Sequence, residues 1–423
     1  PLIGSAHLFL GSDERTFSVI NELFRKYGSF FKLSLGPKTF LCLSDPDLIQ
    51  QALTSSACQD KAFFYRFMEL DYGLISSRYT DWKLYRKSLN PAFNQRILIS
   101  FISIFNRCSE VMVARMAKEA DRRQPFDVLH YTAQCALEMV FASSLKSDIT
   151  DDAQLHEACE AIQNMCTIMS SRMFNVLLYS DLLFTLTHKY HELQKMKVKV
   201  ERVVNPLLHM QRGGRDLEIQ EIENHLNNII AAVSHCLCTC KCANVAFIFI
   251  VNIFTLIVQG SDTTASQVAF ILLMLAMHPK VQDRVHEEIV SIYGSAAPDF
   301  SYETISAQTY LDQVIKETMR MYPVGPIIGR QTIETVKLGD VIVPPGVTLL
   351  INILTVHRNK ELWGDRAHVF DPDRFDPAQY DAKKQHPFSY IPFGGGPRNC
   401  IGYRYGMLAM KIMVTQVLRK YQL

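Results

Sequence analysis

The chain has 423 residues, of which 48% are hydrophobic and 20% charged, so a large buried core is available and a disordered protein is excluded. A net charge of +2 is too small to indicate a nucleic-acid-binding protein. The 11 cysteines are odd in number and follow no framework spacing, which argues for a reducing compartment rather than a disulfide-stapled secreted protein. The chain opens at PLIGSAHLFLG without an initiator Met, as expected of a fragment that begins inside a longer protein.

The predicted elements are mainly helices with a small sheet. Two apolar runs around the turn from Leu35 to Lys38 predict a β-hairpin near the start. Helical periodicity then dominates residues 79–212, 217–293 and 302–321. Residues 335–350 alternate strand and turn patterns, and a final helix begins near Cys400 after a coil-rich stretch. We therefore predict one mainly α domain over residues 1–423, with a small β-sheet subdomain.

Two charged patterns in these helices are ordinary when taken alone. Trp82 and Arg86 lie at i, i+4 in WKLYRK, and an exposed Trp-Arg pair on an amphipathic helix has the same spacing. Glu317 and Arg320 in KETMRMYP lie at i, i+3, which suits a simple helical ion pair. Both patterns gain meaning only from the rest of the chain.

The segment CLCTCKC, Cys236 to Cys242, places four cysteines in alternation. Structural zinc sites use paired C-x(2-4)-C turns, so this spacing is poor geometry for one tetrahedral ion. The apolar run that follows, Ala243 to Gln259, is shorter than the roughly 20 residues of a membrane-spanning helix. The run GSDTTA comes next, and a polar cluster of that kind could also be a helix N-cap.

One further cysteine lies in a glycine-rich loop, PFGGGPRNCIGYRYG, that leads directly into the final helix. A buried structural Cys is the simplest interpretation of Cys400. The glycines, however, let the backbone approach a flat group, and a helix N-terminus favours a thiolate at this position. Loop N–H groups could hydrogen-bond the sulfur, and Arg398 could meet an anionic group beside the same plane.

This loop resembles the F-x-x-G-x-R-x-C-x-G heme-ligand loop of the cytochrome P450 family, and the other patterns resemble further family motifs in the same order. The resemblance implies that Cys400 is the proximal thiolate ligand of heme iron, in a fold that holds heme b between a long distal helix and the cysteine loop. It implies further cofactor contacts at Phe393, Gly396, Arg398, Gly402, Trp82, Arg86 and Arg330, with the last three toward the heme propionates. Glu317, Arg320 and Arg374 would form a structural buried network, with Asp373 standing where Glu is common.

On the distal side the resemblance assigns Asp262 and Thr263 as an acid-alcohol pair that delivers protons to dioxygen. The family motif is interrupted here, because Gln259 and an apolar segment precede the glycine. Deleting Val233 to Gln259 gives one continuous helix in which the family motif is restored as Ala232-Gly260-Ser261-Asp262-Thr263-Thr264. Val-Ser and Gln can be encoded as splice-donor and splice-acceptor consensus codons, so we hypothesise a translated in-frame intron. A genuine insertion and a metal-binding appendage are the competing interpretations.

Sequence segments such as LAMHPKVQDRVHEEI most resemble those of insect members of the family-four clan. The resemblance implies a heme-thiolate monooxygenase that inserts one oxygen atom from dioxygen into a fatty acid, another lipid or a xenobiotic. Electrons would come from NADPH through a reductase, which could contact Lys83, Lys87 and Arg404. The expected location is the cytoplasmic face of the endoplasmic reticulum membrane, through an N-terminal anchor that this chain would lack together with a C-terminal tail. Neither Gln259 nor Ala232 can form the covalent heme ester of many family-four members.

Two other functions stay open at this point. A heme protein without turnover would need the same cysteine loop but not the acid-alcohol pair. A mis-spliced transcript would give an inactive product. The segments 62–70 and 160–185 are expected to line the substrate pocket, and no nucleic-acid partner is expected.

Overall fold

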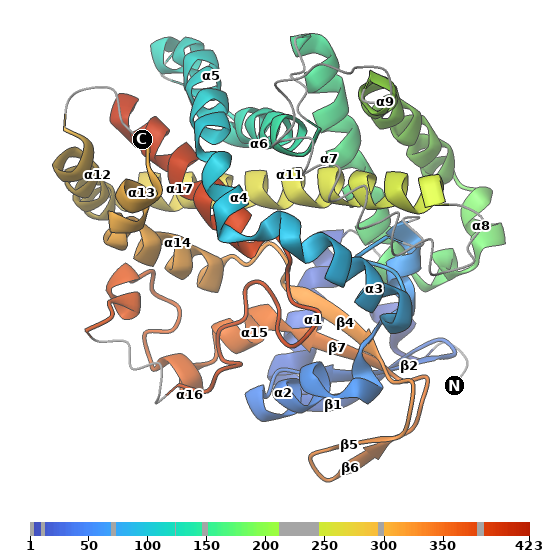
Figure 1. The fold of residues 1–423 in the computed structure, drawn as a ribbon. Coiled ribbons are helices and arrows are strands. Elements are labelled where there is room, and N and C mark those ends of the chain that lie inside the picture. The colour runs from blue at the N-terminus through green and yellow to red at the C-terminus, as the bar shows by residue number, and fades with distance from the viewer. Residues whose placement is uncertain are drawn as a thin grey trace.

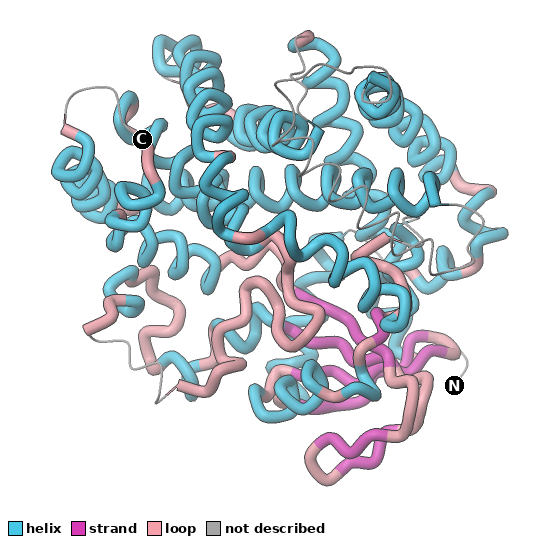
Figure 2. Tube along the Cα trace, in the orientation of Figure 1, coloured by secondary structure: helices cyan, strands magenta, loops and turns pink. Residues whose placement is uncertain are grey.

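The computed structural model describes residues 4–9, 13–68, 73–122, 124–145, 151–210, 245–294, 300–378 and 385–423. The CLCTCKC run therefore lies outside the described residues, as does part of the proposed intron. In the described part, helices form most of the molecule and the strands gather at one end (Figure 2). This agrees with the mainly α class predicted from the sequence.

The N-terminal half consists of short helices around a hairpin, followed by long helices. Asp45 caps one of the short helices by accepting a hydrogen bond from the Leu48 N–H at 3.0 Å, and Pro46 occupies the first turn. The helices of this half are α1 (Asp13–Tyr27), α2 (Pro46–Thr54), α3 (Tyr79–Leu89), α4 (Gln95–Ser100), α5 (Ile102–Arg122), α6 (Val128–Leu145), α7 (Asp152–Phe174), α8 (Asp181–Thr185) and α9 (His188–Met210).

The C-terminal half begins with the longest described helix and ends with another buried one. The predicted helix over 302–321 is broken at Gln308, and the final helix begins three residues after Cys400 rather than at it. The helices of this half are α11 (Val245–Met277), α12 (Pro279–Tyr293), α13 (Tyr302–Ala307), α14 (Thr309–Met321), α15 (Ile353–His357), α16 (Lys360–Trp363) and α17 (Tyr403–Lys420).

Within the part of the chain that the structure describes, seven strands form two sheets. The larger sheet has the order β1-β2-β7-β4-β3, with β2 parallel to β7 and the other pairs antiparallel, and β5 pairs with β6 in a separate hairpin. The sequence predicted the hairpin at Leu35 but not β3 or β4. The strands are β1 (Phe30–Leu35), β2 (Lys38–Leu43), β3 (Asp60–Lys61), β4 (Ile327–Gln331), β5 (Val336–Leu338), β6 (Val341–Val343) and β7 (Thr348–Asn352).

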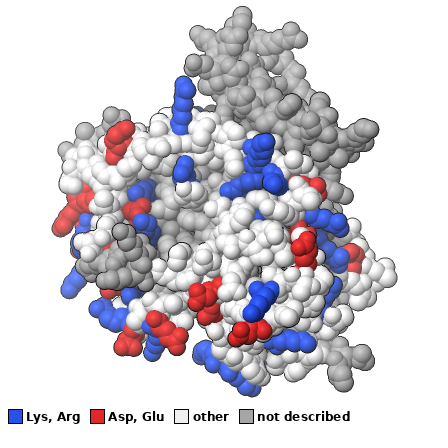
Figure 3. All heavy atoms as spheres, turned by 60° about the horizontal axis from the view of Figure 1, so that its bottom comes forward, with Lys and Arg blue, Asp and Glu red and all other residues white. Residues whose placement is uncertain are grey.

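Helix α11 runs through the middle of the molecule, with α5, α6, α7 and α9 on one side and the larger sheet on the other (Figure 1). It packs against α6, α17, α14 and α7. Residues 254–277 of α11 are long and apolar enough to cross a membrane, but half of this stretch is buried inside the protein, as in a core helix. On the face shown in Figure 3, Lys and Arg are interspersed with Asp and Glu, in line with the small net charge of +2.

The apolar segment before the distal motif is part of α11. Residues 245–259 continue in helical conformation into Gly260. Ile257 and Val258 are fully buried, and the Asn252 Oδ1 accepts a hydrogen bond from the Leu74 N–H at 2.9 Å. These positions therefore lie inside the protein, as part of the core helix. Whether the segment is a translated intron stays a prediction.

Candidate heme site

The loop that carries Cys400 closes tightly before α17. The Cys400 N–H donates to the Phe393 carbonyl at 2.9 Å, and the Asn399 N–H donates to the Gly396 carbonyl at 3.2 Å. Gly396 has a φ of +69°, and a Cβ added there would lie 2.1 Å from the Leu53 carbonyl oxygen. Only glycine fits this position without a shift, because the loop backbone lies directly against α2.

Cys400 differs from the other described cysteines in its exposure. Six of the seven are buried or half-buried, and Cys400 is exposed. Its pKa is nevertheless raised, because surrounding protein groups desolvate the thiol. The Gly402 backbone N–H, Arg86 and Lys61 act against that rise. The sulfur is thus accessible to a ligand while groups that favour a thiolate surround it.

Helix α3 lies beside this loop and contacts it through Arg86. The Arg86 guanidinium donates to the Asn399 carbonyl at 2.6 Å and to its side-chain oxygen at 3.0 Å. Trp82, one turn earlier, is buried, and the Arg398 guanidinium lies 5.1 Å from the centre of its ring. The structure therefore brings the WKLYRK pattern and the cysteine loop together, and Arg86 also donates to the Asn90 side-chain oxygen at 2.8 Å.

Three cationic side chains converge near Cys400. Arg398 is buried and donates to the carbonyls of Gln59 and Ser77, both at 2.9 Å. Arg330 on β4 is 1% exposed, and it donates to the adjacent Gly329 carbonyl at 3.1 Å. Lys61 on β3 is the direct cross-strand partner of Arg330. No described acid forms an ion pair with any of the three.

The three cations disfavour one another's charge. Burial and, to a smaller extent, Arg330 lower the pKa of Arg398 to about 9, while Asp60 opposes the shift. Burial, Arg330 and Arg398 hold the pKa of Lys61 well below its usual range. The Nε atoms of Arg330 and Arg398 have no hydrogen-bond partner in the described part of the chain. Buried unpartnered donors of this kind are expected where an anionic ligand belongs.

The distal motif lies midway along α11. Thr263 is exposed, and its hydroxyl donates to the Gln259 carbonyl at 2.6 Å. Asp262 is half-buried, and burial raises its pKa. A half-buried acid with a raised pKa can hold or release a proton closer to neutral pH than an exposed one.

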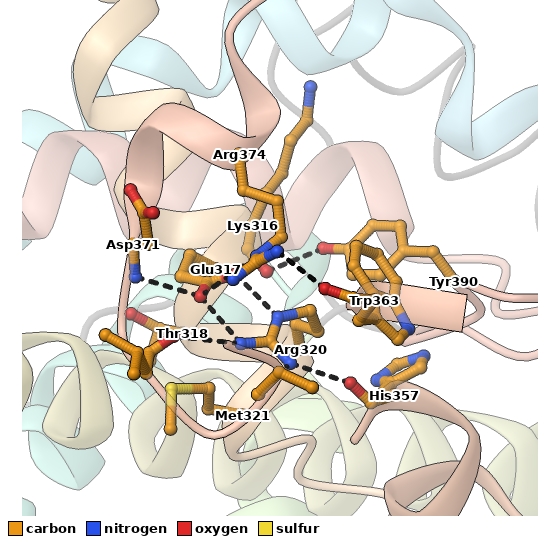
Figure 4. Close-up of polar contacts among 12 residues, drawn as sticks. Lys316, Glu317, Thr318, Arg320, Met321, His357, Trp363, Asp371, Arg374 and Tyr390 are labelled. Atoms are coloured by element: carbon orange, nitrogen blue, oxygen red, sulfur yellow. Dashed lines mark hydrogen bonds and ion pairs between the residues drawn. The ribbon is translucent and has the colours of Figure 1, made fainter. Parts of the chain in front are cut away.

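The Glu317, Arg320 and Arg374 side chains meet behind the cysteine loop (Figure 4). Glu317 and Arg320 are fully buried and form two hydrogen bonds of 2.7 Å each. Arg320 also donates to the carbonyls of His357, Ala367 and Val369. The Arg374 Nε lies 3.7 Å from Glu317, which also accepts from the Asp371 N–H at 3.0 Å.

Asp373, which stands where Glu is common in the family, has a different partner. It pairs with Arg284 of α12 through two bonds of 2.8 Å. The network therefore ties the coil between α16 and the cysteine loop to α14, while Asp373 ties it to α12.

Comparison with known proteins decides the identity of this site. The family model described as cytochrome P450 matches residues 1–423. The chain belongs to the cytochrome P450 family. It is 29% identical to probable cytochrome P450 313a4 of Drosophila melanogaster, over 100% of this chain and 86% of that protein. It is 28% identical to cytochrome P450 4c21 of Blattella germanica and 30% identical to cytochrome P450 4d10 of Drosophila mettleri, again over the whole chain.

As a cytochrome P450, the protein is a heme-thiolate monooxygenase with a heme-iron cofactor, a substrate, dioxygen and a redox partner. The residues present fit heme. The two carboxylates of heme match the cationic cluster of Lys61, Arg330 and Arg398. The Nε atoms of both arginines are buried and have no hydrogen-bond partner in the described part of the chain. The exposed Cys400 sulfur matches the need for a thiolate ligand.

Sequence reasoning missed one residue of this site. Lys61 lies in no recognised motif, and it reaches the cation cluster only because β3 pairs with β4. The sequence gives no signal for this contact, because Lys61 and Arg330 are separated by a long stretch of chain.

Proposed function

We propose that this cytochrome P450 oxidises a lipophilic substrate, such as a fatty acid, another lipid or a xenobiotic. The aromatic rings of Phe63 and Phe67 lie 5.2 and 5.6 Å from that of Tyr179, so the two segments expected to line the pocket pack against each other. Residues 69–70 of the first segment lie outside the described residues. Aromatic and apolar side chains at this place favour a substrate with little polar surface.

The assignment of roles rests on the exposed Cys400 beside three cationic side chains, two of them buried, that form no ion pair within the described residues. Cys400 would bind the iron, and Lys61, Arg330 and Arg398 would hold the carboxylates. When bound, heme supplies the redox-active iron at which dioxygen is reduced and cleaved. Asp262 would take up a proton and pass it on, and Thr263 would orient the water that carries it.

Electrons would come from NADPH through a flavoprotein reductase. Lys83 and Lys87 on α3 and Arg404 at the start of α17 are exposed, on the two helices that flank the cysteine loop. Basic side chains there suit an acidic partner surface. A contact at this place would bring electrons to the thiolate side of the heme.

We place the protein at the cytoplasmic face of the endoplasmic reticulum membrane. Leu182 and Leu186, in and just after α8, are 72% and 76% exposed, and Leu177 and Leu183 lie exposed nearby. An apolar patch of this kind suits contact with a lipid surface. Three of these four leucines belong to the segment 160–185, where a lipophilic substrate would enter.

The competing function is a heme protein without turnover. The half-buried Asp262 and the exposed Thr263 favour the monooxygenase, because a carrier needs no proton delivery. Deleting Val233 to Gln259 tests the alternative that the chain is an inactive product of mis-splicing.

The decisive experiment is expression with heme followed by reduction under carbon monoxide. We expect the red-shifted Soret band of a thiolate complex, its loss in Cys400→Ala, and peroxide or product formation on addition of NADPH and reductase. A His-type band would remove the thiolate assignment. A thiolate band without any NADPH consumption would favour the protein without turnover.

A further inference from the structure

The turn that precedes α3 brings a serine to the cation cluster. Residues 73–77 form this turn, in which the N–H groups of Ser76 and Ser77 donate to the Gly73 carbonyl at 3.3 and 3.0 Å. The Arg398 guanidinium in turn donates to the Ser77 carbonyl at 2.9 Å. Both backbone polar groups of Ser77 are therefore paired, and its hydroxyl is the group that can still bind a ligand.

The Ser77 hydroxyl is buried and unpaired. Ser77 is 6% exposed, and its Oγ has no hydrogen-bond partner among the described residues. The Oγ and the carbonyl oxygen of a serine are each two bonds from its Cα, so the Ser77 hydroxyl lies close to the Arg398 guanidinium that binds its carbonyl. The Nε of Arg398 is unpaired in the same sense. Because proteins rarely leave buried polar groups unpaired, a ligand oxygen is expected beside both.

Two further contacts fix the position of the turn. On the distal side, the Asn252 Oδ1 of α11 accepts from the Leu74 N–H at 2.9 Å, and this contact is buried. Immediately after the turn, the Tyr79 N–H donates to the Asp60 carboxylate at 2.7 Å, and Asp60 precedes Lys61 on β3. The turn is therefore held between the distal helix and the strand that carries one of the three cations.

A hydroxyl at this place complements the three cations. Each terminal nitrogen of Arg398 already donates to a carbonyl, and Arg330 donates to the Gly329 carbonyl. An ionised carboxylate can accept hydrogen bonds at about four lone-pair sites, so it has room for a further donor. A serine supplies that donor without adding another positive charge to side chains that already disfavour one another's charge.

We propose that Ser77 is a further cofactor-binding residue, whose hydroxyl donates a hydrogen bond to a heme carboxylate held by Arg330 and Arg398. The inference rests on the proposed carboxylate site and extends it to a residue outside every motif identified in the sequence. It also connects the cofactor to the distal helix, because Asn252 of α11 holds the turn that carries Ser77. A shift of α11 at Asn252 would move the hydroxyl relative to the carboxylate.

Transfer of heme from the holoenzyme to apomyoglobin tests this contact without any turnover. We expect Ser77→Ala to lose heme about tenfold faster than the wild type, the size expected from losing one hydrogen bond to a charged group. Ser77→Thr keeps the hydroxyl and should return the rate close to the wild-type value. Thr80→Ala is the matched control, because it removes an exposed hydroxyl at the start of α3 and should leave the rate unchanged.

Resonance Raman spectroscopy of the ferric holoenzyme shows whether the hydrogen bond is made to the carboxylate itself. The propionate bending band should shift to lower frequency in Ser77→Ala, because the carboxylate loses a donor. The band should keep its wild-type frequency in Ser77→Thr and in Thr80→Ala. A side chain that only packs beside the heme would leave the band in place when it is shortened to alanine.

Three outcomes would overturn the inference, and they can be told apart. If Ser77→Ala loses heme faster but the propionate band does not move, Ser77 acts through packing alone. If neither the rate nor the band changes in Ser77→Ala while Arg330→Gln speeds heme loss, the carboxylate site of the proposed function stands without Ser77. If Arg330→Gln also leaves the rate unchanged, the cationic site in the proposed function fails, and the inference fails with it.

Discussion

Lys61 and Arg330 are direct partners in the register of β3 and β4, so two cationic side chains occupy facing positions on neighbouring strands. Like charges placed in this way destabilise a sheet unless a third group compensates them. Burial and the two arginines hold the pKa of Lys61 well below its usual range. An anionic ligand between these side chains removes the repulsion, which makes Lys61 informative to mutate.

We expect Lys61→Met to weaken heme retention. Losing one charge-assisted hydrogen bond to a carboxylate should speed heme loss by about tenfold or more. Transfer of heme from the holoenzyme to apomyoglobin, followed by absorbance, measures the rate. Lys32→Met, an exposed lysine on β1, is the control. Equal rates for wild type and Lys61→Met would show that Lys61 does not contact the cofactor.

The glycines of the cysteine loop provide a matched pair. Gly396 and Gly394 have φ values of +69° and +71°, so alanine strains both. A Cβ at Gly396 meets the Leu53 carbonyl oxygen at 2.1 Å, whereas at Gly394 the nearest atom is 4.0 Å away. Gly394→Ala should therefore cost about 1–2 kcal/mol and keep the thiolate band. Gly396→Ala should lose most heme-loaded protein, and equal yields would contradict the close contact with α2.

The buried Glu317–Arg320 pair should be far more sensitive than an exposed pair. Glu317→Ala leaves the Arg320 charge buried, which costs roughly 3–5 kcal/mol and should give little folded holoprotein. Arg284→Ala breaks a pair whose side chains are 50% and 42% exposed, and should cost about 1 kcal/mol or less. Urea unfolding followed by fluorescence compares the two. A normal yield of stable Glu317→Ala protein would mean that the network is not needed for the fold.

Thr263→Ala should keep heme and substrate binding but divert NADPH-derived electrons into hydrogen peroxide. The reason is that the water that carries the proton loses its hydroxyl partner. The ratio of peroxide released to NADPH consumed measures this. Thr264→Ala is the matched control, because the Thr264 hydroxyl is buried and donates to the Gly260 carbonyl at 2.8 Å. An unchanged ratio in Thr263→Ala would show that another group delivers the proton.

Deleting Val233 to Gln259 tests the intron hypothesis. If the segment is a translated intron, the deletion should raise the soluble heme-loaded yield, because the residues ending at Ala232 then continue directly into Gly260. Zinc content should stay at none in both forms. The spliced transcript across codons 225–270 gives an independent answer.

The structure shows which contacts the deletion would remove. The deletion removes Asn252, which accepts from the Leu74 N–H, and the fully buried Ile257 and Val258. His225, Ile230 and Ala231 would take these three positions in the shifted register. A fall in yield or activity, with a transcript that retains the segment, would mean that 233–259 belongs to the mature protein.

The sequence by itself was sufficient for the features that are encoded locally. The mainly α class, the hairpin at Leu35, the helix after the cysteine loop and the spacing of Glu317 and Arg320 all follow from neighbouring residues and short-range hydrogen bonds. The cytochrome P450 resemblance likewise rests on contiguous motifs, and the family match over the whole chain confirms it. The roles of the individual site residues stay predictions.

Only the tertiary structure decided which distant residues meet. Lys61 joins Arg330 through strand pairing, Arg86 meets Asn399 across 313 residues, and Thr132 of α6 donates to the Ala265 carbonyl of α11. Periodicity also cannot distinguish an inserted apolar segment from a helix buried on all sides, since both lack a polar face. Asn252, Thr255, Ile257 and Val258 are buried in the core, and burial depends on what surrounds a segment and not on its own composition.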